Sequence, residues 1–73
     1  MTHNYRLREL RGSSELTQVE LAGRLNVSQN RVSRIEQGDI YRARVDTLRM
    51  YGEEVGGRLR VEVELGDERI QIA

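Results

Sequence analysis

Two short helical segments joined by a tight turn, residues 17–25 and 28–37, constrain this chain more than any other feature. Thr17 followed three residues later by Glu20 is the capping-box pattern that starts a helix. Asn26 tolerates the left-handed backbone conformation in which helices end, so the first segment stops there. Apolar residues recur at helical spacing in both segments. We therefore expect their apolar sides to pack against each other.

The rest of the front part of the chain also has helical periodicity. We expect a short helix over Tyr5–Leu10, followed by a break at residues 12–14, because glycine and serine favour turns. Another helix is expected over residues 45–55, although Gly52 inside it costs about 1 kcal/mol relative to alanine. The inward-facing residues of that helix are expected to be Val45, Leu48, Tyr51 and Val55.

The hydrophobic pattern changes from a helical to an alternating period after the glycines at 56–57. Residues 58–73 alternate between apolar and polar positions around Gly66-Asp67, which is a two-residue hairpin signal. One register pairs apolar side chains on one face and opposite charges on the other. That register places Leu65 opposite Glu68, Val63 opposite Ile70, Val61 opposite Ile72 and Glu64 opposite Arg69.

A lone two-stranded hairpin is only marginally stable in water, so its apolar face needs a partner surface. That surface is the 45–55 helix, the same hairpin of a second chain, or both, and we favour strands that pair across a two-fold axis. The residues expected at this dimer interface are Leu59, Val61, Val63, Ile70 and Ile72. The sequence thus predicts one mainly α domain, residues 1–73, with about four helices over 5–57 and a dimerising hairpin over 58–73.

Composition excludes several classes of function. The chain has 73 residues, no cysteine and a single histidine, His3, so disulfides, thiolate metal sites and catalytic triads lack the residues they need. The acidic pairs of the hairpin are better explained as a solvated surface than as catalytic carboxylates. No apolar run approaches the ~20 residues of a membrane span, and no signal-peptide core is present. We expect a cytoplasmic binding module without metal, cofactor, small-molecule substrate, membrane contact or enzymatic activity.

The formal net charge is zero, but the charges are divided along the chain. Residues 1–50 contain nine arginines and six acidic residues, which gives +3, whereas residues 51–73 contain three arginines and six acidic residues, which gives −3. All the basic residues of the sequence are arginine except His3, and lysine is absent. Codon bias is one explanation, and the other is that arginine forms bidentate hydrogen bonds to phosphate and guanine. Residues 1–50 are therefore suited to binding a polyanion, and residues 51–73 to a different role.

A rotation of about 100° per residue divides the 28–37 helix into two sides. Val32 and Ile35 lie close together on one side and anchor the helix. The opposite, polar side consists of Gln29, Asn30, Ser33 and Arg34. Amide side chains pair bidentately with adenine and arginine pairs with guanine, so this side suits DNA base edges. Together with the two-helix spacing, it predicts a helix-turn-helix whose second helix enters the major groove.

The run Leu16–Gly38 resembles the Xre/Cro-repressor family, which has a lambda-repressor-like helical bundle. The resemblance implies that the chain binds operator DNA and uses the polar side of the 28–37 helix for base contacts. Contacts to DNA phosphates are implied for Thr17, Gln18, Arg31, Arg42 and Arg44. The resemblance also implies a structural ion pair between Arg11 and Glu36, which ties the first helix to the base-contacting helix.

The chain after residue 46 departs from that family, because a helix ending in Val55-Gly56-Gly57 leads into a hairpin. This arrangement resembles HigA-type antitoxins, which often extend ahead of the first helix, where this chain has residues 1–4. The resemblance implies a homodimeric repressor of its own operon, an inverted-repeat operator with half-sites about 10 bp apart or a multiple of that, and a HigB-type ribonuclease toxin as partner. The alternatives are a stand-alone or phage-type Xre repressor and a protein adaptor that uses the hairpin edge.

Overall fold

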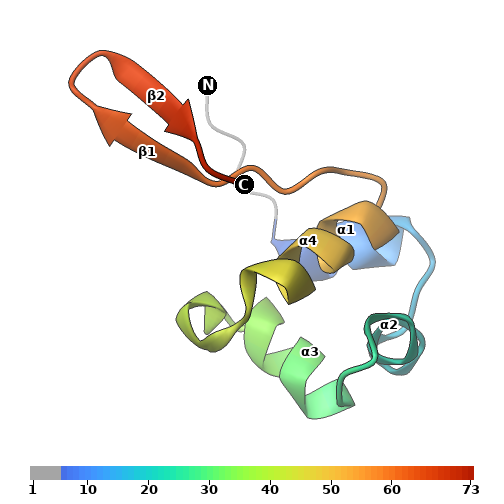
Figure 1. Ribbon diagram of the computed structural model, residues 1–73. Helices are drawn as coiled ribbons and strands as arrows, with labels where there is room; N and C mark the ends of the chain where they lie inside the picture. The colour runs from blue at the N-terminus through green and yellow to red at the C-terminus, as the bar shows by residue number, and fades with distance from the viewer. Residues whose placement is uncertain (1–5) are drawn as a thin grey trace.

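A cluster of helices carries a C-terminal β-hairpin that projects from it (Figure 1). This computed structural model describes residues 6–73, so the expectations for His3 and Tyr5 lie outside the described residues. Within this range the elements are α1 (Leu7–Ser13), α2 (Gln18–Leu25), α3 (Gln29–Glu36), the 3₁₀ turn η1 (Ile40–Arg42), α4 (Val45–Glu54), β1 (Glu62–Leu65) and β2 (Glu68–Gln71). The predicted fold class is confirmed. None of these helices has the length and apolar character needed to cross a membrane.

The first helix is longer at its C-terminal end than the sequence predicted. It continues through Gly12 to Ser13, whereas the expected end was Leu10. The Ser13 hydroxyl donates a hydrogen bond to the carbonyl of Glu9 at 3.0 Å, so the serine remains inside the last helical turn. A serine hydroxyl that bonds to the carbonyl four residues earlier is compatible with a helix. The helix therefore ends after Ser13 and not at Leu10.

The central pair of helices is built as the sequence predicted. Thr17 caps α2, because its hydroxyl accepts from the backbone N–H of Glu20 at 3.1 Å and the Glu20 carboxylate accepts from the N–H of Thr17 at 3.1 Å. Asn26 ends α2 in the left-handed conformation with φ 57°. These two local signals fix the start and the end of α2, so the turn into α3 has little freedom.

The core lies between α2, α3 and α4, with Leu16 ahead of them. The buried side chains are Leu16, Leu21, Ala22, Leu25, Val32, Ile35 and Tyr51. Leu48 and Val55 pack against this core as partly buried residues. The expectation for Val45 is wrong, since its side chain is 49% exposed. Val45 is the first residue of α4, so it lies at the end of the helix and outside the buried core.

Three of the four predicted hairpin pairs are confirmed, namely Val63↔Ile70, Glu64↔Arg69 and Leu65↔Glu68. Val61 and Ile72 lie beyond the paired strands, where the N–H of Ile72 donates to the Val61 carbonyl at 2.8 Å and the N–H of Val61 donates to the Ala73 carbonyl at 2.9 Å. Gly66 takes φ 57° in the connecting turn, a value that favours glycine at this position. All eight residues of β1 and β2 are exposed, and Figure 1 shows the hairpin pointing away from the helices. Its apolar face is therefore uncovered in one copy of the chain.

A close backbone contact explains the glycine inside α4. The linker after α4 returns over Gly52, where the N–H of Gly57 donates to the Gly52 carbonyl at 2.8 Å. A Cβ at position 52 would lie 3.4 Å from the backbone nitrogen of Leu59. The glycine thus lets the linker run directly along α4, and this contact sets the direction in which the chain leaves for the hairpin.

Candidate nucleic-acid interface

Helix α3 presents a polar side to solvent and buries its apolar side. Val32 and Ile35 are 0% and 1% exposed, respectively. The opposite side carries Gln29, Asn30 and Arg34 as exposed residues, while Ser33 is half-buried. The predicted orientation of this helix is therefore confirmed, and three of the four candidate base-contacting side chains are free to meet a ligand.

A chain of side-chain hydrogen bonds connects α3 to the start of α2. The Nε2 of Gln29 donates to Oε1 of Gln18 at 3.4 Å, and the Nε2 of Gln18 donates to Oε1 of Glu36 at 3.0 Å. The Gln18 side chain therefore holds the Gln29 side chain, which begins α3, towards the start of α2. Local sequence patterns do not reveal this chain, because its members are eleven and eighteen positions apart.

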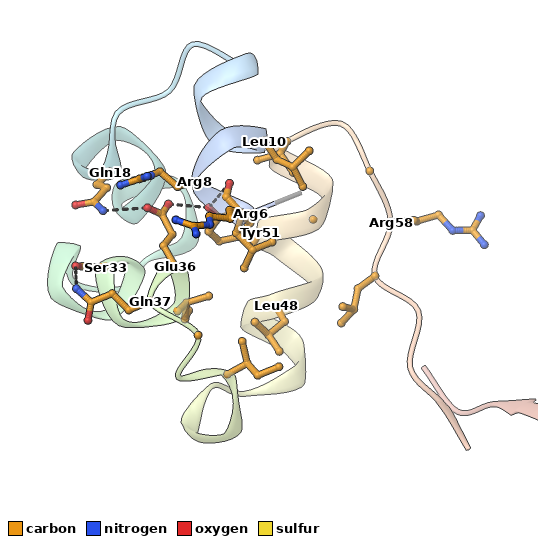
Figure 2. A pocket seen from close by; sticks show the side chains of 18 residues that line it. Arg6, Arg8, Leu10, Gln18, Ser33, Glu36, Gln37, Leu48, Tyr51 and Arg58 are labelled. Atoms are coloured by element: carbon orange, nitrogen blue, oxygen red, sulfur yellow. Dashed lines mark hydrogen bonds between the residues drawn. The ribbon is translucent and has the colours of Figure 1, made fainter. Parts of the chain in front are cut away.

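The Glu36 carboxylate is the centre of a partly buried polar cluster. The Arg11 Nε lies 2.6 Å from Oε2 and the Arg11 Nη2 lies 3.2 Å from Oε1, so the ion pair is bidentate. The Tyr51 hydroxyl donates to Oε2 at 2.7 Å (Figure 2). The two charged side chains are only 14% and 4% exposed. This cluster joins α1, α3 and α4, and Tyr51 is the member that sequence analysis placed only in the core.

The pKa values in this cluster follow from burial and hydrogen bonding. Burial raises the pKa of Glu36, but the hydrogen bonds from Arg11, Gln18 and Tyr51 outweigh it, and the pKa lies below its ordinary value. Burial and the hydrogen bond to Glu36 raise the pKa of Tyr51 well above its ordinary value. Glu36 is thus a carboxylate and Tyr51 a neutral hydroxyl at neutral pH, which keeps the donors and acceptors complementary.

Four exposed arginines lie on α3, in the turn that follows it and at the start of α4. Arg31, Arg34, Arg42 and Arg44 are exposed, and none of them forms an ion pair with a carboxylate of residues 6–73. Arg31 and Arg44 line one polar hollow between the α2–α3 turn and the start of α4. The structure thus brings together two of the predicted phosphate contacts from separate elements. Their charges are available to an external anion.

The remaining predicted residues are Thr17 and the five residues of the expected dimer interface. The Thr17 hydroxyl is used as the helix cap, but its own hydrogen remains available as a donor. Of the predicted dimer residues, Leu59 and Val61 are half-buried, whereas Val63, Ile70 and Ile72 are 43%, 44% and 63% exposed. Leu65, which the prediction omitted, is 57% exposed on the same face. In the described part of the chain, no cluster of three or more His, Cys, Asp or Glu residues could hold a metal ion.

Comparison with known proteins places this architecture in a family. A family model described as a helix-turn-helix domain matches residues 5–53. The Mycobacterium tuberculosis protein named "Putative antitoxin HigA2" is 51% identical over 69 residues, which cover 94% of this chain and 68% of that protein. The chain belongs to the HigA family of helix-turn-helix proteins. A second relative of this HigA-family chain is "Putative antitoxin HigA3" of the same organism. It is 35% identical over 69 residues, which cover 93% of this chain and 63% of that protein.

Solved structures of HigA proteins have the same fold as this HigA-family chain. One, described as "Induced DNA bending by unique dimerization of HigA antitoxin", has a TM-score of 0.79 and 33% identity, and covers 97% of this chain and 92% of its own. Another, "DNA bound antitoxin HigA3", has a TM-score of 0.73 and 33% identity, with coverages of 99% and 94%. This chain spans about two thirds of the length of the two curated relatives, at 68% and 63%.

Proposed function

We propose that this chain is a dimeric, sequence-specific DNA-binding repressor that acts as the antitoxin of a toxin–antitoxin module and represses its own operon. The observation that carries the proposal is the exposed polar side of α3, which is held outward by buried Val32 and Ile35. The DNA-bound HigA3 structure, which has the same fold, supports it. Base contacts are assigned to Gln29, Asn30, Ser33 and Arg34, and phosphate contacts to Thr17, Gln18, Arg31, Arg42 and Arg44.

The hydrogen-bond chain at the start of α2 is compatible with both kinds of contact. A glutamine side chain has two N–H donors and one carbonyl acceptor. Gln18 uses one N–H for Glu36 and keeps the other for a phosphate oxygen. Gln29 uses one N–H for Gln18 and keeps the other N–H and its carbonyl, which are the two groups that pair with adenine. The network therefore orients the two glutamines without consuming the atoms that DNA needs.

Selection of bound duplexes from a random library tests the DNA-binding function directly. We expect inverted repeats with half-sites about 10 bp apart or a multiple of that distance. Gln29→Ala should weaken binding by about 1–3 kcal/mol and relax one base position. Arg42→Ala should weaken all sequences alike and reduce the salt slope by about one unit for each protomer of the dimer. No enriched sequence for the wild type, or a changed base preference in Arg42→Ala alone, would contradict these assignments.

Dimerisation through the hairpin is supported by its uncovered apolar face, on which Val63 and Ile70 form a cross-strand pair. Two recognition helices about 34 Å apart would then meet successive major grooves. The double change Val63→Asp and Ile70→Asp should convert the dimer to a monomer in sedimentation at micromolar concentration and lower operator affinity. Gln71→Asp, which adds a carboxylate to the other face, is the control. A wild-type monomer, or an unchanged mass for the double variant, would refute this interface.

The antitoxin role concerns a protein partner as well as DNA. Residues 51–73 carry a net charge of −3, which complements a basic RNA-cleaving toxin of the HigB type. Co-expression should rescue cells from such a toxin encoded beside this gene. A stand-alone or phage-type Xre repressor is the second candidate, and absence of rescue by the full-length protein would favour it. We further propose that the chain works in the cytoplasm and has no catalytic activity.

A further inference from the structure

We infer that Arg6 and Arg8 extend the DNA-contacting surface from the helix-turn-helix onto α1, where they bind backbone phosphates next to the one assigned to Gln18. This inference rests on the proposed DNA-binding function and assigns it two contacts that the sequence motif does not contain.

The position of Arg8 follows from the network around Glu36. Arg8 precedes Arg11 by three residues, so the two side chains are neighbours on the α1 surface. Arg11 and Gln18 both bond the Glu36 carboxylate. Arg8 and Gln18 thus belong to elements that the Glu36 carboxylate holds together, and both line the hollow drawn in Figure 2.

A single hollow of about 890 Å³ connects these side chains to the base-contacting helix. Arg6, Arg8, Gln18 and Ser33 all line it. Ser33 belongs to the polar side of α3, and Gln18 to the proposed phosphate-binding turn. The two guanidinium side chains thus share a concave surface with Gln18 of α2 and Ser33 of α3, and the proposed contact is to the backbone of a duplex that lies on this surface.

Arg6 and Arg8 also lack a neutralising partner. Both are exposed, and no carboxylate of residues 6–73 lies within ion-pair distance of either. Residues 1–5 contain no acidic side chain that could supply one. By contrast, Arg24 and Arg49 each pair with a carboxylate of α4. Unpaired cations beside a phosphate-binding turn are the arrangement that a polyanion stabilises.

Counterion release gives the expected size of the effect. Each phosphate neutralised by a cation contributes about −0.9 to the slope of log affinity against log salt concentration. Removing two contacts from each protomer of the dimer removes four in all, which should make the slope shallower by about 3.6. The affinity lost between 50 and 200 mM salt should then be about 150-fold smaller for the variant than for the wild type.

The experiment measures operator affinity by fluorescence anisotropy at 50, 100 and 200 mM salt for the wild type and the double variant Arg6→Ala, Arg8→Ala. Arg69→Ala is the matched control, because Arg69 is an exposed arginine without an ion pair on the hairpin. Phosphate-ethylation interference on the same operator maps the contacts. For the double variant only, we expect a shallower slope and the loss of two interference positions in each half-site. The base preference should be unchanged in both variants.

An unchanged salt slope and interference pattern in the double variant would overturn the inference while leaving the proposed function intact. A wild-type protein without salt-dependent specific binding would instead refute the proposed function. The side chains are exposed, so the variant should unfold at the wild-type temperature. If it does not, Arg8→Gln keeps a polar side chain and removes the charge, and its slope should become shallower by about 1.8 for the dimer.

Discussion

Replacing Glu36 by glutamine should lower the free energy of unfolding by about 3 kcal/mol. Glu36 is 4% exposed and its partner Arg11 is 14% exposed, so the substitution leaves a cation in a largely water-excluded site without its counter-charge. Breaking a buried pair from one side costs about 3–5 kcal/mol. We take the lower end because a glutamine carbonyl still accepts one of the bonds now made by Arg11, Gln18 and Tyr51.

Thermal and urea unfolding followed by circular dichroism measure this loss. For a domain of this size, about 3 kcal/mol corresponds to a decrease in Tm of about 12–24 °C. Arg24→Ala is the control, because it breaks an ion pair with Glu54 at 3.0 Å in which the side chains are 56% and 31% exposed. Such an exposed pair is worth less than about 1 kcal/mol. All variants are compared at one protein concentration, since the proposed dimerisation would make stability depend on concentration.

The comparison between the two substitutions decides the question. If Glu36→Gln lost no more stability than Arg24→Ala, the cluster would be solvated and the ion pair would not join α1 to α3. A loss that disappeared at high salt would lead to the same conclusion, because salt screens exposed charges and leaves buried ones largely unaffected. Either result would refute the argument from burial.

Three further predictions concern local features of the fold. Hydrogen bonds keep the pKa of Glu36 below its ordinary value of 4.5. Their contribution to stability is complete above pH 4.5 and is lost progressively as the pH falls through the pKa of the folded state. The stability of Glu36→Gln should therefore decrease less steeply than that of the wild type in this acid range. Thr17→Ala should cost about 1 kcal/mol in chemical unfolding and Thr17→Ser much less, because only alanine removes the capping oxygen. Gly52→Val should cost about 1–3 kcal/mol, since its side chain would meet the linker backbone, and an unchanged midpoint would show that the linker is not packed there.

Local signals in the sequence accounted for much of the fold. Thr17, Glu20 and Asn26 determine where α2 begins and ends because caps act through backbone groups within a few residues. The hairpin register followed from alternation, since a shift by one residue would reverse every side chain. The outward side of α3 followed from helical periodicity. The late end of α1 and the exposed Val45 differ from the prediction because helix ends depend on what packs against them.

By itself, then, the amino-acid order determined the helix-turn-helix, the side of α3 that faces outward and the apolar face of the hairpin, because each depends on near neighbours in the chain. Only the tertiary structure decided that Glu36 is shared by Arg11, Gln18 and Tyr51, and that the linker lies against Gly52. The gathering of Arg6, Arg8, Gln18 and Ser33 around one hollow was likewise decided by packing. These contacts join residues that are distant in the chain, and their geometry exists only after the helices have packed together.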